Sequence, residues 1–464
     1  MASLRSPTWD RADPWLAAGA AAAAGTAAVL GIAGAASGSL PTLAAAGVLG
    51  AAATGVLLAA RWVEPLPLLV FTLPLPALYA TDDVRLAPVV PLSALAVAAW
   101  LVSAGRSADG LGRHVRGVAA LLAAVVVATL FAEVPSAALR ETMNFALLLG
   151  LAAVSADLVA HRPSRAAVVA RSVAVVAAGA GGAAILEGLG VLPGRFPLSG
   201  SPLTRAAGGF GWPNELGMFL AVSVPFSVHA VRSARTSWGR TAALAGLLLA
   251  GAGLAATFSR GSWLAVVLSP ASLLAVGEAR TALRFWGAAV AAALALDLVT
   301  GGMLSTRILS TTGDVLVAQR ILLMAAGLLM FRSSPLVGVG PGGFGDALDR
   351  FGVQISGLFD YVGSAHNGYV HMAAEAGLLG LAALLWFLGT ALSSLARGLR
   401  TRGAAPAPGA GDPSRPLRVT LLWSFTTACL VSFFEWPFAH GVGELIVLVA
   451  GMGMALAPRE AGRA

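Results

Sequence analysis

The chain contains about fourteen apolar runs that are each long enough to cross a lipid bilayer as a helix. We place them at 15–35, 40–60, 64–80, 86–104, 116–133, 139–160, 166–192, 213–231, 241–258, 261–277, 285–303, 370–396, 419–436 and 441–457. Backbone groups in lipid must bond to one another, so each crossing segment should be an α-helix. Charged residues make up only 11% of the sequence, against about 25% in soluble domains. The sequence therefore predicts an all-α polytopic transmembrane helix bundle of about 12–14 spans, forming a single membrane domain over residues 1–464.

The positions of the arginines predict the orientation of this bundle. All 30 basic residues are Arg, and 21 of them fall on one set of loops and termini while 9 fall on the other. Cytoplasmic loops of membrane proteins are enriched in basic residues, so the richer set is predicted to be cytoplasmic, together with both termini. Successive loops alternate between the two sides of the membrane in this way only if Ile321–Phe331, a short run between Arg320 and Arg332, does not cross the membrane. We therefore predict one long external loop, about 304–366, with an interfacial helix inside it.

Polar residues next to the membrane on the predicted external side are candidates for function. Arg205 precedes Pro213 and Asn214, and either of these two could begin a helix, since Pro fits the first turn and Asn is a good cap. Capping is the simpler role for Asn214, and anchoring at the interface is the simpler role for Arg205. Arg260 lies against the membrane, where an ionisable residue is a functional candidate and a lipid headgroup anchor is the alternative.

A glycine-rich segment lies in the long external loop. Gly338, Gly340 and Gly343 have the spacing of a dinucleotide-binding fingerprint, but no βαβ unit surrounds them and the predicted side is external. A nicotinamide cofactor is therefore excluded. The backbone N–H groups of such a loop could cradle a phosphate, and a plain turn is the alternative.

The loop ends at His366, followed by Asn367, Gly368 and Tyr369. A neutral imidazole accepts a proton near physiological pH, which makes His366 a candidate general base. His371 and Glu375 are four residues apart and share one helix face. No metalloprotease-like HExxH pattern is present, so we predict a local contact between this pair and neither a metal nor a cofactor in the protein.

Together these segments resemble the O-antigen ligase and O-antigen polymerase superfamily of bacterial envelope proteins. The resemblance runs from about Arg205 to Gly380 and rests on four pieces: Arg205 with Gly208, Pro213 and Asn214; Ser259-Arg260-Gly261 with Trp263; Arg320 ahead of Pro335–Gly340; and His366–Tyr369 leading to Glu375–Gly380. Members are polytopic helical membrane proteins that transfer a glycan from a polyprenyl diphosphate carrier to an acceptor hydroxyl.

The resemblance implies roles for named residues of this chain. Arg260 and Arg320 are expected to bind the diphosphate, and His366 is expected to activate the acceptor. The remaining matched residues are expected to contact substrate: Arg205, Asn214, Gly338, Gly340, Asn367 and Tyr369. The implied partners are an undecaprenyl-diphosphate-linked donor, a lipid or glycan acceptor and membrane lipids, with no nucleic acid. The implied location is the bacterial inner membrane, with the active site on its outer face.

Two alternatives to a ligase remain open at the level of sequence. A polymerase that joins lipid-linked repeat units needs the same charges. A transporter would be expected to carry functional charges near the midplane of broken helices, whereas the clustered features here are external. Direct attack by the acceptor would invert the anomeric centre, and a double displacement would need a carboxylate nucleophile, for which three candidates are available: Asp346, Asp349 and Asp360.

Overall fold

The computed structural model describes residues 65–75, 79–80, 85–86, 88–104, 115–192, 196–197, 204–309, 315–351, 363–400, 414–438 and 441–456, so the predicted runs 15–35 and 40–60 lie outside the described residues. Contacts divide the chain into two compact units, residues 1–108 and 109–464, where the sequence predicted a single domain.

The first unit contains helices α3 (Pro65–Thr72) and α4 (Val89–Ala104) and an antiparallel pair of two-residue strands, β1 (Tyr79–Ala80) and β2 (Arg85–Leu86). Helix α3 is much shorter than the predicted run 64–80. Pro74 and Pro76 follow it, and Pro has no N–H with which to continue a helix.

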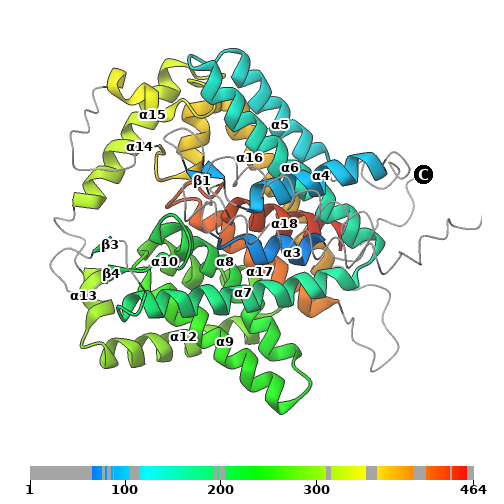
Figure 1. Cartoon of the computed structure of the whole chain (residues 1–464), viewed down its shortest axis with the longest axis vertical. Coiled ribbons are helices and arrows are strands. Elements are labelled where there is room, and N and C mark those ends of the chain that lie inside the picture. The colour runs from blue at the N-terminus through cyan, green and yellow to red at the C-terminus, as the bar shows by residue number, and fades with distance from the viewer. Residues whose placement is uncertain are drawn as a thin grey trace, which may run out of the picture. The chain divides into compact units, whose positions relative to one another are not determined.

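The second unit is a helix bundle (Figure 1). Its helices are α5 (Val115–Leu130), α6 (Pro135–His161), α7 (Ser164–Gly188), α8 (Pro213–Ser233), α9 (Ser237–Ala256), α10 (Arg260–Leu268), α11 (Ala271–Leu274), α12 (Ala279–Val299), α13 (Met303–Leu309), α14 (Val315–Ser333), α15 (Phe344–Ala347), α16 (Gly368–Arg400), α17 (Arg415–Val431) and α18 (Val442–Ala455), with a 3-10 turn η2 at Leu348–Phe351. Strands β3 (Phe196–Pro197) and β4 (Thr204–Arg205) form a second two-residue pair. The prediction of an all-α fold is confirmed.

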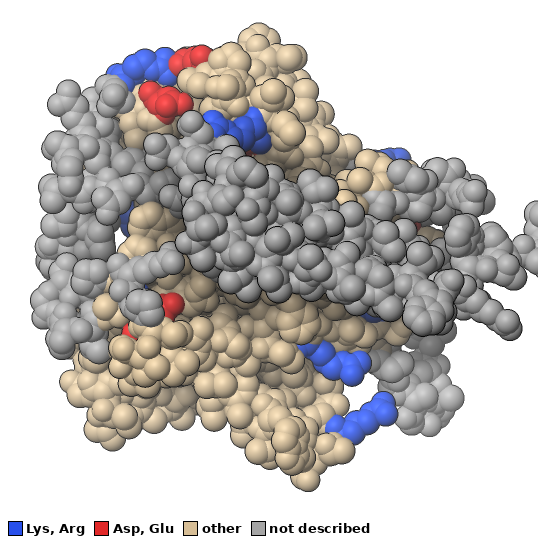
Figure 2. Space-filling view, in the orientation of Figure 1, with Lys and Arg blue, Asp and Glu red and all other residues tan. Residues whose placement is uncertain are grey.

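Among the described residues, six helices are long and apolar enough to cross a membrane: α6, α7, α8, α9, α12 and α16. Apolar side chains are exposed on α6, α7, α9, α12 and α16. On α12, for example, Leu294 and Leu298 are 65% and 83% exposed, and the described part of the face in Figure 2 is largely uncharged. Continuous apolar surface of this kind is a liability in water and suits contact with lipid. The chain is therefore a multi-pass membrane protein, as the sequence predicts.

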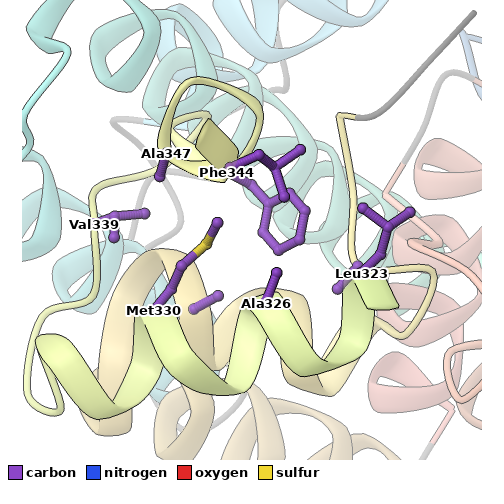
Figure 3. Close-up of a cluster of buried hydrophobic side chains, with 9 residues drawn as sticks. Leu323, Ala326, Met330, Val339, Phe344 and Ala347 are labelled. Atoms are coloured by element: carbon purple, nitrogen blue, oxygen red, sulfur yellow. The ribbon is translucent and has the colours of Figure 1, made fainter. Parts of the chain in front are cut away.

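Helix α14 is longer than the sequence predicts. It begins at Val315, so Arg320 lies in its second turn, whereas the sequence placed this residue before the apolar run. One side of α14 packs into a buried cluster with the glycine-rich segment and α15 (Figure 3); its members are Leu323, Ala326, Met330, Val339, Phe344, Ala347, Leu348, Ala365 and Ala374. This core joins the helix that carries Arg320 to Ala365, the neighbour of His366.

Close backbone packing fixes the glycine-rich segment against a kink in α16. Gly377 has φ 63° and ψ −159°, a conformation open essentially to glycine alone. A Cβ atom on Gly377 would lie 2.3 Å from the carbonyl carbon of Leu336, and one on Gly338 would lie 2.3 Å from the carbonyl carbon of Glu375. The two backbones can approach this closely only because both positions lack a side chain.

We expect Gly377→Ala to destabilise the protein by about 3 kcal/mol or more, because it adds both a backbone clash and an unfavourable φ. Gly389→Ala is the matched control, since Gly389 lies in the same helix and a Cβ there meets no atom within 4 Å. That change should be neutral or stabilising by up to about 1 kcal/mol. Thermal unfolding in detergent measures both, and equal stability of the two variants would contradict the packing argument.

Candidate active site

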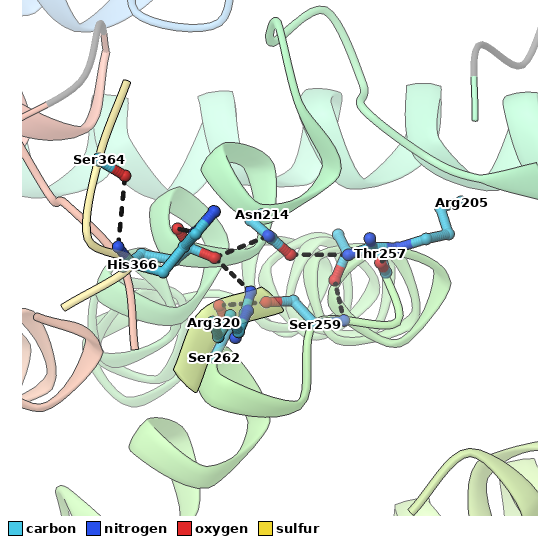
Figure 4. A network of polar contacts seen from close by, with 9 residues as sticks. Arg205, Asn214, Thr257, Ser259, Ser262, Arg320, Ser364 and His366 are labelled. Atoms are coloured by element: carbon cyan, nitrogen blue, oxygen red, sulfur yellow. Dashed lines mark hydrogen bonds and ion pairs between the residues drawn. The ribbon is translucent and has the colours of Figure 1, made fainter. Parts of the chain in front are cut away.

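Glu435 is the centre of a polar network that includes Asn214, Arg320 and His366, three residues that Figure 4 labels. It follows α17, and its side chain is 10% exposed. Its Oε1 accepts hydrogen bonds from Arg320 Nη2 at 2.5 Å and from Asn214 Nδ2 at 2.7 Å, and its Oε2 lies 2.7 Å from His366 Nδ1. One buried carboxylate thus joins residues from α8, α14 and the start of α16.

The charge on Glu435 is stabilised by its partners. Burial by itself raises the pKa of a carboxyl group. Here nearby positive charge and hydrogen bonding outweigh that effect and hold the pKa of Glu435 below its ordinary value; the contributing residues are Arg320, His366 and Arg205. Glu435 is therefore ionised at neutral pH. An ionised carboxylate only accepts hydrogen bonds, so Nδ1 of His366 carries the hydrogen in this contact, which makes Nε2 the acceptor nitrogen of a neutral ring.

His366 is held in an unusual backbone conformation. Among the described residues only Phe258 and His366 are non-glycine residues with positive φ, at 50° and 49°. The next residue, Asn367, caps α16: its Oδ1 accepts from the N–H groups of Tyr369 and Val370, and its Nδ2 donates to the Phe433 carbonyl. The cap thus ties the position of His366 to the segment that carries Glu435. Strained residues of this kind cluster at functional sites.

Asn214 connects Arg205 to Glu435 through hydrogen bonds. Arg205 donates from Nη2 to Asn214 Oδ1 at 2.7 Å and from Nε to the Thr257 carbonyl at 3.0 Å. Asn214 lies in the first turn of α8, and Pro213 begins this helix, as the sequence allowed. The Asn214 side chain does not cap the helix, however, because its oxygen faces Arg205 and its nitrogen faces Glu435.

Three further arginines act electrostatically on Arg205. Burial lowers the pKa of Arg205 to about 10, and the positive charges of three further guanidinium groups add to the effect: Arg307, Arg320 and Arg260. Arg205 still remains protonated at neutral pH. Among the described residues, several guanidinium groups thus act electrostatically on this network, and positive charge of this kind suits a polyanionic ligand.

Arg260 begins α10, two residues after the strained Phe258. The next residue, Gly261, allows the start of α10 to approach Phe434, the residue before Glu435. A Cβ atom on Gly261 would lie 2.5 Å from the Cβ of Phe434. The start of α10 is therefore packed directly against the segment that carries the central carboxylate. The motif around Arg260 and the segment around Glu435 belong to one structural unit.

Backbone N–H groups of the glycine-rich segment donate hydrogen bonds within the protein. Glu375 accepts the N–H of Gly342 at Oε2 and the N–H of Phe344 at Oε1, and the carbonyl of Glu375 accepts the N–H of Gly340. The N–H of Gly338 bonds to the Ser334 carbonyl. The structure thus gives Gly338 and Gly340 a packing role, while their predicted part in binding substrate stays a prediction.

Tyr369, His371 and Glu375 make contacts within or next to α16. Tyr369 donates its hydroxyl to the Cys429 carbonyl at 2.9 Å, a contact that joins α16 to α17. His371 Nε2 and Glu375 Oε2 lie 3.4 Å apart. Within the described part of the chain, no three His, Cys, Asp or Glu side chains are grouped so that they could hold a metal ion.

Neither Glu435 nor Arg307 is among the candidate residues predicted from the sequence. Glu435 lies at the end of the apolar run 419–436, between Phe434 and Trp436. An ionisable side chain at the end of a predicted span is itself a functional signal, and it could have indicated this residue. Arg307 is one of the nine arginines on the predicted external side.

A comparison with protein families found one match. Residues 245–385 match the family described as O-Antigen ligase. The matched stretch contains Arg260 on α10, Arg320 on α14 and His366 in the segment before α16. No curated protein matches the chain. The match confirms, over residues 245–385, the resemblance to the O-antigen ligase superfamily predicted from the sequence, and it supports a glycan transferase of the ligase or polymerase type.

Proposed function

We propose that the protein transfers an oligosaccharide or polysaccharide from an undecaprenyl-diphosphate carrier to an acceptor hydroxyl, acting as a ligase. The observation that carries the proposal is the network around Glu435, which holds the His366 ring through its Nδ1 atom and brings it close to Arg320, with Arg205 joined through Asn214. Glycan transfer from a diphosphate needs these two elements: a base for a weakly nucleophilic hydroxyl and positive charge for the leaving group.

In this mechanism Arg260 and Arg320 bind the diphosphate. Guanidinium groups match phosphate oxygens bidentately and stay charged, so they stabilise the negative charge that grows on the leaving group. The acceptor oxygen forms a bond to the anomeric carbon while the bond to the diphosphate oxygen breaks and its electron pair leaves with the diphosphate. His366 Nε2 takes the proton of the acceptor hydroxyl. The reaction involves no metal and no cofactor.

Glu435 orients the base and does not act as a nucleophile. Both of its oxygens are engaged, Oε1 by Arg320 and Asn214 and Oε2 by His366. Three of the roughly four acceptor sites of this carboxylate are occupied, which weakens it as a nucleophile. Of the three aspartates considered for a double displacement, Asp346 is exposed on α15, Asp360 lies outside the described residues and the side chain of Asp349 is not described. The hydrogen bonds that hold Glu435 favour direct displacement, with inversion at the anomeric carbon.

We place this site on the outer face of the inner membrane, with both termini in the cytoplasm. Support comes from the arginine distribution and from the helix directions, because α8 runs from Asn214 in the site to Arg232 at its far end, where Arg232 bonds Thr281. In a Cys429→Ala background, Asp346→Cys should react with an impermeant thiol reagent in intact spheroplasts, whereas Ser237→Cys should react only after permeabilisation. The reverse pattern would reject this orientation.

Transfer is tested with purified protein, a lipid-linked donor and candidate acceptors. Product on a lipid or glycan acceptor supports the ligase, and elongation of a second carrier-linked repeat unit supports a polymerase with the same site. Uptake of a radiolabelled solute by proteoliposomes without any transfer would favour a transporter and contradict the proposal.

A further inference from the structure

Glu435 connects the two halves of the proposed reaction through separate oxygens. Oε1 bonds the diphosphate-binding Arg320, and Oε2 bonds the base His366. The carboxylate is therefore shared between a cation that would bind the donor and a ring that must become a cation during transfer. Any change in the contact with Arg320 alters the charge that His366 experiences.

The partners of Glu435 differ in how readily a ligand can reach them. The Arg320 side chain is 31% exposed, whereas that of Glu435 is 10% exposed. A diphosphate can thus approach the guanidinium and compete with Glu435 for it. Asn214 Nδ2 also holds Oε1 and is neutral, so the carboxylate keeps its place when Arg320 turns to the ligand.

We propose that donor diphosphate, by drawing Arg320 away from Glu435, activates His366 as a base. The inference rests on the proposed function. While Arg320 is paired with Glu435, the two opposite charges largely cancel at the imidazole ring. Once the diphosphate takes Arg320, the negative charge of Glu435 acts on His366 alone and stabilises the imidazolium that forms when Nε2 accepts the acceptor proton. Glu435 is thereby a positioning residue that couples donor binding to activation of the base.

Coulomb's law indicates that the effect is measurable. A unit charge several ångströms from the ring, at the effective dielectric constant of about 20 that suits protein sites, changes proton affinity by about tenfold or more. The other charged groups that bear on this network in the described residues are Arg205, Arg260 and Arg307, and their charges do not change over the working pH range. His366 is therefore the group whose protonation should respond when Arg320 leaves Glu435.

The experiment measures the proton state of His366 without glycan transfer. Diethyl pyrocarbonate modifies neutral imidazole, so the pH midpoint of His366 modification, read by peptide mass spectrometry on the full-length protein in detergent, reports its protonation. Adding inorganic diphosphate should raise this midpoint by about one pH unit. Arg320→Gln should raise it by a similar amount before any ligand is added. His161, exposed on α6, is an internal reference whose midpoint should not move.

A double-mutant cycle separates the proposed coupling from direct repulsion between Arg320 and His366. In a Glu435→Gln background, diphosphate and Arg320→Gln should each shift the midpoint by less than half as much as they do when Glu435 is present. If the Glu435→Gln variant does not insert into the membrane, Glu435→Ala replaces it. Arg332→Gln, exposed on the same helix as Arg320, is the matched control and should leave the midpoint unchanged. An unshifted midpoint in Arg320→Gln or with diphosphate overturns the proposal, as do full shifts without Glu435. Since this readout involves no transfer, it can fail while the transfer assay succeeds.

Discussion

Replacing Arg320 with Ala is expected to reduce the rate of glycan transfer by about 10³-fold or more at saturating donor, and Arg260→Ala should have a comparable effect. Each change removes a permanent positive charge from the place where the leaving diphosphate gains negative charge. Arg320→Ala also leaves the buried Glu435 without its closest cation, which should lower stability as well. Transfer rates of the folded fraction, after gel filtration in detergent, separate these two losses.

Two further variants sharpen this test. Arg320→Lys keeps the charge but lacks the planar fork of donors, so it should restore stability while recovering little of the rate. Arg332 is an exposed residue of the same helix, α14, and the Arg332→Ala variant should transfer glycan at the normal rate. Near-normal rates in both Arg260→Ala and Arg320→Ala would show that the diphosphate is bound elsewhere.

Replacing His366 with Gln is expected to cost about 10²–10⁴-fold in the rate of transfer, with a much smaller effect on donor binding. Gln keeps a hydrogen-bond donor toward Glu435 but cannot take up a proton. In the wild type the rate should fall as the pH is lowered, because a protonated imidazole cannot accept the proton of the acceptor hydroxyl. That acid limb should be absent from the residual activity of His366→Gln.

The control for the histidine is His161→Gln, which alters an exposed histidine on α6 that is paired with Asp157 and should leave the rate and the pH profile unchanged. EDTA should have no effect on any of these proteins. Inhibition by EDTA that added metal reverses would reject the metal-free mechanism, and an undiminished rate in His366→Gln would remove this residue from the chemistry.

The membrane bundle and several components of its site could be predicted from local sequence. Long apolar runs specify helices because lipid offers no hydrogen bonds to the backbone, and this argument needs no tertiary information. Pro213 marked a helix start because its ring already has helical φ. Arg205, Arg260, Arg320 and His366 stood out because charged or titratable side chains at membrane boundaries are costly unless they have partners or a function.

The partners of those residues were decided only by the tertiary structure. Glu435 is 221 residues from Asn214 and 115 from Arg320, and no local pattern encodes contacts over such separations. The glycine-rich segment illustrates the same point. Its spacing suggested a phosphate cradle, but Glu375 takes up the N–H groups of Gly342 and Phe344, and the kink at Gly377 leaves space only for a bare backbone. Sequence identifies which side chains need a partner, whereas packing of distant helices determines which partner each one finds.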